Sequence, residues 1–177
     1  MDLPADEELD SRSVHLLGQV PPLNVARMLT RTGVAPEFYA CLSAMFAEDW
    51  FPATDREVIL FRTCRDNDSA YPIAQHRAFG VPPAATVDAV LSDELGALDP
   101  WHQALCRMSD EMASAAKLSE ESVLELVGHY CSQNAAARAI FVMSWFNMLT
   151  RYVDSTGVPV ESGPNAFGDI TGPTGVN

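Results

Sequence analysis

The side chains best suited to chemistry lie in two neighbouring segments of the chain, REVILFRTCR and SAYPIAQH. Helical spacing places Ser69 and His76 on one face of the second segment, and Glu57 and Cys64 on one face of the first. The turn between them is short, so the two helices should pack as neighbours. We therefore expect a carboxylate, an imidazole and a hydroxyl to converge on one partly buried pocket, as general acid–base catalysis requires.

Tyr71 and Gln75 form an adjacent stripe on the same helix, within reach of that pocket. Arg62 is suited to holding a substrate carboxylate in a bidentate pair, although a salt bridge with a nearby acid (Glu57, Asp66 or Asp68) is the simpler interpretation. Cys64 is either a nucleophile or, as free cysteines usually are, part of the core. A structural alternative also exists for His76 and Glu57. A lone helical histidine often belongs to the core, and an acid in a first turn complements the helix dipole.

Composition limits the class of protein. The chain has 177 residues, enough for one domain with a substantial core, and 47% of them are hydrophobic. The net charge of −13 argues against nucleic-acid binding and favours a small-molecule or protein partner. No apolar run is long enough to span a membrane, and the acidic start is unlike a signal peptide, so we expect a cytoplasmic protein.

Motifs for metals and cofactors are missing from the sequence. The four cysteines are widely spaced, with no CxxC or Cys/His ligand pattern, and we expect reduced thiols. No two histidines have i, i+4 spacing, and there is no glycine-rich phosphate loop or GxSxG elbow. We therefore expect neither a metal nor a cofactor.

The apolar pattern is helical throughout and predicts an all-α fold of about seven to eight helices. Residues 1–20 form an acidic N-terminal segment, 21–161 the helical domain, and 162–177 a tail rich in Gly and Pro. Capping and spacing signals predict helices over 25–33, 35–50, 56–65, 69–80, 85–91, 100–117, 123–131 and 135–153.

The segments REVILFRTCR, SAYPIAQH, LDPWHQALCRMSDEM and FNMLTRYVDSTGVPVE together resemble the carboxymuconolactone decarboxylase-like family, which includes the alkyl hydroperoxidase D proteins. The resemblance runs from about residue 21 to Glu161. It implies an alkyl hydroperoxidase D-like helical bundle that associates as a homotrimer or homohexamer, with the active site near a subunit interface; a dimer is an alternative.

In the peroxidase branch of that family, a glutamate and a histidine relay protons to a pair of cysteines. The resemblance places the glutamate at Glu57, the histidine at His76 and the two cysteines at Ser69 and Pro72. Neither serine nor proline can form a disulfide, so peroxidase chemistry of that kind is excluded at this site. Many non-redox relatives read (C/S/A)EYEWAQH here, and Ala70 and Pro72 replace both of its glutamates.

The resemblance and the residues together predict a cofactor-independent lyase or isomerase/cyclase that acts on a small organic acid, lactone or biosynthetic intermediate. His76 is expected to be the principal acid/base, Glu57 to orient it or relay its proton, and Tyr71 to donate a hydrogen bond to a substrate oxygen. The side chains expected to bind substrate are Ser69, Arg62, Cys64, Gln75 and Trp145.

Two alternatives remain open at this point. One is a family member without catalysis that serves as a small-molecule-binding or assembly protein, because the cysteines and both glutamates are replaced. The other is residual peroxidase activity through Cys64 alone.

Overall fold

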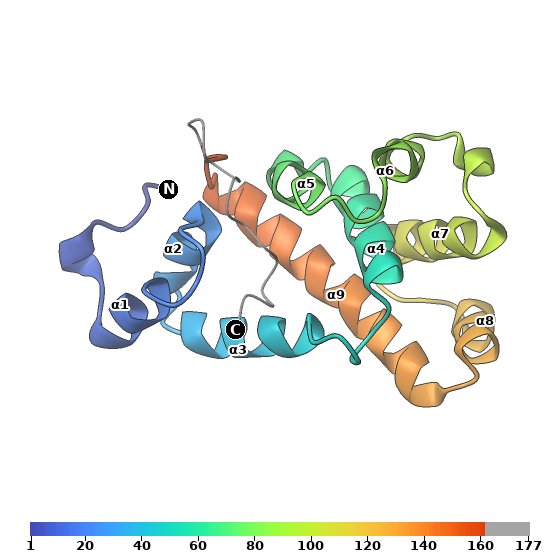
Figure 1. Ribbon diagram of the computed structural model, residues 1–177, viewed down its shortest axis with the longest axis horizontal. Helices are drawn as coiled ribbons and strands as arrows, with labels where there is room; N and C mark the ends of the chain where they lie inside the picture. Colours follow the sequence, from blue (N-terminus) through green and yellow to red (C-terminus); the bar gives the residue numbers. More distant parts are fainter. Residues whose placement is uncertain (162–177) are drawn as a thin grey trace.

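The computed structural model describes residues 1–161, and in this range the chain is all helical, as expected (Figure 1). It has nine α-helices and two short 3-10 helices. In chain order these are η1 (Asp6–Glu8), α1 (Ser11–Leu17), α2 (Asn24–Thr30), α3 (Ala35–Met45), α4 (Ala53–Asp66), α5 (Ala70–Arg77), α6 (Ala84–Leu91), η2 (Leu95–Ala97), α7 (Pro100–Ala115), α8 (Glu120–Tyr130) and α9 (Gln133–Thr156).

Of the nine α-helices within residues 1–161, α1 is the one that the sequence pattern does not predict. It lies in the acidic N-terminal segment, where only Ser13 and Leu16 of its seven residues are buried, so it has almost no apolar periodicity. Tertiary packing against α2 and α3 holds it in place. The N-terminal ammonium group also donates a hydrogen bond of 2.6 Å to the Thr156 carbonyl, which ties this segment to the end of α9.

Side-chain caps begin four of the nine α-helices within residues 1–161: α1, α7, α8 and α9. The Asp99 carboxylate accepts from the first backbone N–H groups of α7, with Pro100 at its first position, and Ser119 caps α8. The helix expected over 56–65 begins three residues earlier: α4 begins at Ala53, directly after Pro52. The Asp55 carboxylate accepts hydrogen bonds from Tyr130 and Trp101.

Helices α4 and α9 form the centre of the molecule (Figure 1). Helix α4 is buried on nearly all sides because it packs against α5, α6, α7 and α9, which explains the uninterrupted apolar run Val58–Phe61. Helix α9, 24 residues long, runs diagonally across the fold from α8 to α2. Because of its length, α9 contributes residues to the packing at both ends of the protein.

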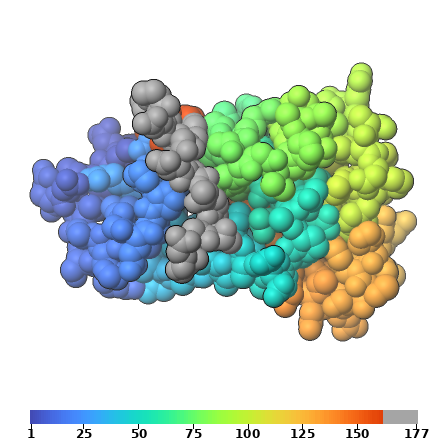
Figure 2. Space-filling view, viewed as in Figure 1, coloured from blue at the N-terminus to red at the C-terminus, as the bar shows by residue number. Residues whose placement is uncertain are grey.

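Two apolar clusters result from this arrangement. The larger is built around α4 and the helices from α6 to α9, and the smaller joins α1, α2 and α3 to Tyr71, Val153 and Val158. Figure 2 shows the two ends of the molecule, with the N-terminal elements in blue at one end and the α6–α8 region at the other. Leu149 of α9 packs against both clusters, and the candidate site lies where they meet.

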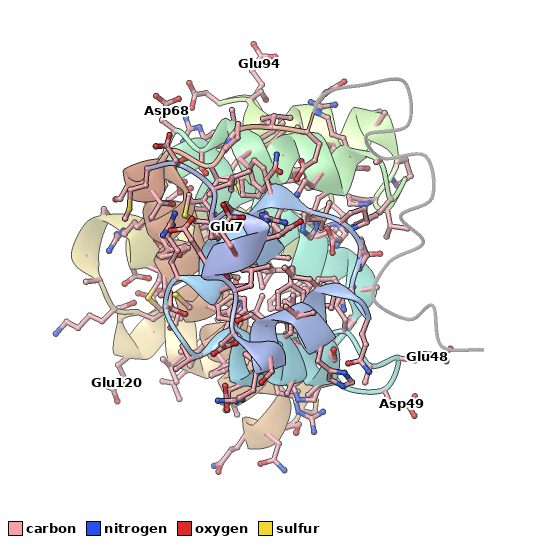
Figure 3. All side chains as sticks on the ribbon, turned by 90° about the vertical axis from the view of Figure 1, so that its left-hand side faces the viewer. Glu7, Glu48, Asp49, Asp68, Glu94 and Glu120 are labelled. Atoms are coloured by element: carbon pink, nitrogen blue, oxygen red, sulfur yellow. The ribbon has the colours of Figure 1, made fainter. Side chains whose placement is uncertain are left out.

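The acidic side chains spread over the surface. The acids labelled in Figure 3 come from separate parts of the chain and point outward; they are Glu7, Glu48, Asp49, Asp68, Glu94 and Glu120. None of the helices within residues 1–161 combines the length and apolar character that a membrane span requires. The expected Gly/Pro-rich tail, 162–177, lies outside the described residues.

Candidate active site

The structure brings Glu57 and His76 together. Helix α4 carries the glutamate and α5 the histidine, and Glu57 Oε2 lies 2.6 Å from Nδ1 of His76. The two side chains are only 3% and 12% exposed, so water does not compete strongly for this hydrogen bond. Because a carboxylate accepts only, a neutral His76 keeps its proton on Nδ1, and Nε2 is left as a base.

The carboxylate of Glu57 has a second partner. Its Oε1 accepts a hydrogen bond of 3.3 Å from Nε of the neighbouring Arg56, whose guanidinium lies over the ring of Phe46. Arg56 also donates to the Met45 carbonyl. Glu57 is therefore held by a buried cation on one side and by His76 on the other, which fixes its orientation.

Four phenyl rings surround the imidazole. The ring centroids of Phe46, Phe61, Phe79 and Phe146 lie 4.9–6.5 Å from that of His76, in tilted or edge-on contact. Such packing restricts rotation of the imidazole and lowers the local dielectric. Both effects strengthen the hydrogen bond to Glu57.

His76 lies on the wall of a cavity of about 90 Å³. A cavity needs about 10–15 Å³ to hold one water molecule, so a cavity of about 90 Å³ has room for several non-hydrogen atoms of a ligand. Its lining residues are Pro21, Leu23, Val25, Leu29, Phe38, Tyr39, Leu42, Phe46, Gln75, His76, Phe79, Phe146 and Leu149. The described lining contains no Lys, Arg, Asp or Glu, which makes it suited to an uncharged, mainly apolar molecule.

Tyr39 is a cavity residue that the sequence pattern alone did not single out. Burial, with a smaller effect from the nearby Glu161 carboxylate, raises the pKa of its phenol well above the ordinary value. The hydroxyl therefore keeps its proton and serves as a hydrogen-bond donor. The signal for it was present in the sequence: Tyr39, Leu42 and Phe46 recur at i, i+3 and i+7, one face of a helix.

Tyr71 lies outside the cavity lining. Its hydroxyl donates to Oε1 of Glu161 at 2.6 Å, and it accepts from the backbone N–H of Val25 at 3.0 Å and from Nε2 of Gln75. Burial, and then the bond to Glu161, raise the pKa of the phenol. All the hydrogen-bonding capacity of this hydroxyl is thus used within the fold. Gln75, one turn further along, does line the cavity.

Ser69 and Arg62 are also engaged within the fold. Ser69 precedes α5 and donates to Asp154 Oδ1 at 3.1 Å, which connects α5 to α9. Arg62 is buried and binds both carboxylate oxygens of Asp110, and its Nη1 group donates to the carbonyls of Val90 and Ser92. The acid that pairs with Arg62 thus comes from α7, not from the neighbouring acids considered on sequence grounds.

Cys64 and Trp145 lie in the apolar parts of the structure. Cys64 is fully buried in the larger cluster, and burial raises the pKa of its thiol, which makes it a poor nucleophile. The indole of Trp145 packs on Phe38, with ring centroids 4.5 Å apart, and neither Cys64 nor Trp145 is among the described lining residues. Of the predicted site residues, the structure places Glu57 behind the cavity and His76 and Gln75 on its wall.

Residues 1–161 contain no group of three or more His, Cys, Asp or Glu side chains arranged to hold a metal ion. No model of a known protein family matches the chain, and no curated protein matches it. The site is therefore interpreted from its own geometry.

Proposed function

We propose that this protein is a cofactor-independent, non-redox enzyme of the lyase or isomerase/cyclase type, with His76 as general acid/base. The observation that carries the proposal is the orientation of His76. Glu57 holds its Nδ1 atom at 2.6 Å, while the same ring lies on the wall of an apolar cavity. A general base is effective when its imidazole is oriented by a second group and its free nitrogen can reach the substrate.

The simplest reaction of this site is proton transfer in a carbonyl compound. His76 Nε2 takes a proton from the carbon next to the carbonyl, the C–H electron pair moves into the carbonyl group, and an enolate forms. Glu57 stabilises the imidazolium, and the protonated Tyr39 hydroxyl donates to the enolate oxygen. Return of the proton to another carbon of the same conjugated system completes an isomerisation, with no oxidant or co-reactant required.

The lining favours one of the expected substrate classes over the others. A carboxylate would lose its hydration in a cavity whose described walls carry no cationic side chain, and Arg62 is occupied by Asp110. We therefore propose a neutral lactone or related carbonyl compound in preference to an organic acid.

Membership of the carboxymuconolactone decarboxylase-like family remains a proposal. It is supported by the all-α fold of residues 1–161 and by the contact between Glu57 and His76, the pair that the resemblance assigns to a proton relay. Assembly as a homotrimer or homohexamer, and a cytoplasmic location, are proposed on the same resemblance and on the composition.

A binding protein without catalysis is the second candidate. The hydroxyls of Tyr71 and Ser69 and the guanidinium of Arg62 all bind other parts of the fold. His76 is the one imidazole among the described lining residues. A cavity with so few free polar side chains would also suit a protein that carries an apolar metabolite without reacting with it.

An exchange experiment separates the two candidates. α-Angelica lactone is a small neutral carbonyl compound with acidic ring protons, and NMR in D₂O follows their replacement by deuterium and the shift of the double bond. The proposal expects the wild-type protein to accelerate both processes, His76→Ala to abolish the acceleration, and His15→Ala, a change at an exposed histidine, to leave it intact. Equal rates in wild type and His76→Ala would overturn the proposal. Binding without acceleration would favour the carrier.

A further inference from the structure

Gln75 has an unusual position for a buried amide. It is 6% exposed, it lies on the cavity wall beside His76, and its nitrogen is bound on the opposite side. Nε2 donates to the Tyr71 hydroxyl and lies 3.5 Å from Oε2 of Glu161. Since neither of these bonds uses the amide oxygen, Oε1 of Gln75 is available to a ligand.

The hydrogen bonds of Tyr71 fix which way this amide faces. A phenol has one proton, and Tyr71 gives it to Glu161 Oε1 at 2.6 Å. Towards Gln75 the phenol oxygen therefore acts only as an acceptor. A flipped amide would place Oε1 against that acceptor and against a carboxylate, and both contacts would be repulsive.

Glu161 anchors this arrangement to the cavity wall. Its Oε1 atom accepts the backbone N–H of Asn24 at 2.6 Å, and Tyr71 accepts that of Val25 at 3.0 Å. These are N–H groups of the first turn of α2, which have no partner within the helix. Tyr71, Gln75 and Glu161 thus form one hydrogen-bonded group at the start of α2. It holds in place both the amide of Gln75 and the segment from Pro21 to Val25, which lines the cavity.

We propose that Gln75 is a specificity-determining residue that selects a neutral ligand carrying a hydroxyl or N–H group. His76 lies on the same wall. The inference rests on the proposed function, in which Nε2 of His76 is a second acceptor for the ligand. Two acceptors side by side need two protons from the ligand. One is the proton that His76 removes, and the other is a hydroxyl or N–H that binds Oε1 of Gln75. The substrate class is thus a neutral carbonyl compound that also bears a hydroxyl or N–H.

Matched probes test this selection. 4-Methylphenol and p-xylene have nearly the same shape and differ by a hydroxyl in place of a methyl group, while 4-methylbenzoate and 4-methylbenzylammonium add a charge of either sign. Titration calorimetry on wild type, Gln75→Leu and the surface control Gln133→Leu gives the ratio of the two neutral affinities. We expect Gln75→Leu to reduce the preference for the phenol over the xylene about tenfold, as removal of one hydrogen bond to a buried acceptor should, and Gln133→Leu to keep it.

The wild-type arm keeps the proposal testable even if Gln75→Leu is poorly folded. In wild type, the phenol should bind more tightly than the xylene and than either charged probe. Tighter binding of a charged probe, or an unchanged phenol preference in folded Gln75→Leu, would overturn the inference. The lactone exchange reaction is a separate readout. Exchange that persists without phenol selectivity would reject the role of Gln75 alone, whereas selectivity without exchange would reject the proposed catalysis alone.

Discussion

Nδ1 of His76 and Oε2 of Glu57 lie 2.6 Å apart, although 19 positions separate the two residues in the chain. Helices α4 and α5 pack together directly after a short turn, and this packing produces the contact. The pair is the structural basis of the proposed acid–base chemistry, and the first prediction concerns it.

Replacement of Glu57 by Gln should lower turnover while substrate binding changes little. An amide in place of the carboxylate can present either oxygen or N–H₂ to Nδ1, so the proton on His76 is no longer held there, and the imidazolium loses its counter-charge. We expect kcat for lactone isomerisation to fall at least about tenfold, and by about 10²–10⁴ for His76→Ala. The exposed Glu48→Gln is the matched control and should retain wild-type kcat. A Glu57→Gln protein with unchanged kcat would remove Glu57 from the mechanism.

Replacement of Tyr71 by Phe should affect stability. The change leaves the N–H of Val25, the amide of Gln75 and the carboxylate of Glu161 without their shared partner. Loss of buried hydrogen bonds of this kind costs about 1–3 kcal/mol in the free energy of unfolding, which urea denaturation measures. Tyr152→Phe removes a single bond, to the Met28 carbonyl, and should cost less. If Tyr71 instead contacts substrate, Tyr71→Phe will lower kcat at unchanged stability.

Replacement of Arg62 by Met should destabilise the fold strongly. Arg62 neutralises Asp110 and satisfies two backbone carbonyls, and the hydrogen bond to Asp110 raises the pKa of its guanidinium further. Breaking one side of a fully buried ion pair costs about 3–5 kcal/mol. Because the Asp110 side chain is 37% exposed, we expect a loss towards the lower end of this range. Exposed Arg107→Met, which loses only a 3.6 Å contact with Glu125, should be nearly neutral in the same denaturation assay. A stable Arg62→Met protein with a raised KM would restore the substrate-binding role expected from the sequence.

Asp66 should make stability depend on pH. Burial, and then a hydrogen bond with Asp110, raise its pKa from 3.8 to about 6. Burial also acts to raise the pKa of Asp110, but hydrogen bonds with Arg62 and Asp66 outweigh it, and the pKa of Asp110 is lowered. Oδ2 of Asp66 is buried without an N–H or O–H partner among the described residues, as expected if it carries the proton shared with Asp110.

Since the pKa of Asp66 is raised in the folded state, its contribution to stability is complete below about pH 4 and is lost as the pH rises through about 6. Asp66→Asn resembles the protonated acid at every pH. Its free energy of unfolding relative to wild type should therefore increase between pH 4.5 and 7.5, measured by urea denaturation. Asp49→Asn, at an exposed site, should show no such trend. A constant difference for Asp66→Asn across this range would contradict the assignment of the shared proton.

The thiols should differ sharply in reactivity. Burial raises the pKa of Cys64 and raises that of Cys106 to about 12, whereas Cys131 is exposed. In native protein at pH 8, Ellman's reagent should react fast with Cys131, and Cys64 and Cys106 should react only after denaturation. Mass spectrometry of the labelled peptides identifies each site. Rapid labelling of Cys64 in the folded protein would revive the possibility of a peroxidase reaction through that residue.

Much of this structure follows from local sequence. The helical class, the caps at Asp99 and Ser119, and the neighbourhood of Glu57 and His76 depend on spacing and on one short turn, so they are readable from the chain. Local patterns extend over a few helical turns, and within that range they located helices α2 to α9, although α4 begins three residues earlier than expected. The short helix α1 was missed because its periodicity is weak and its packing partners come later in the sequence.

Tertiary structure alone decided which polar groups remain free for a ligand. Sequence placed Tyr71, Ser69 and Arg62 near the site, but Glu161, Asp154 and Asp110, which bind them, come from distant parts of the chain. The cavity likewise forms where two apolar clusters meet, so Tyr39 and Gln75 define it only after α2, α3, α5 and α9 have packed. Hydrogen-bond partners and cavities depend on contacts between remote segments, and no local pattern of residues encodes them. The chain alone thus indicated that Glu57 and His76 are neighbours, and the fold determined the surroundings of that pair.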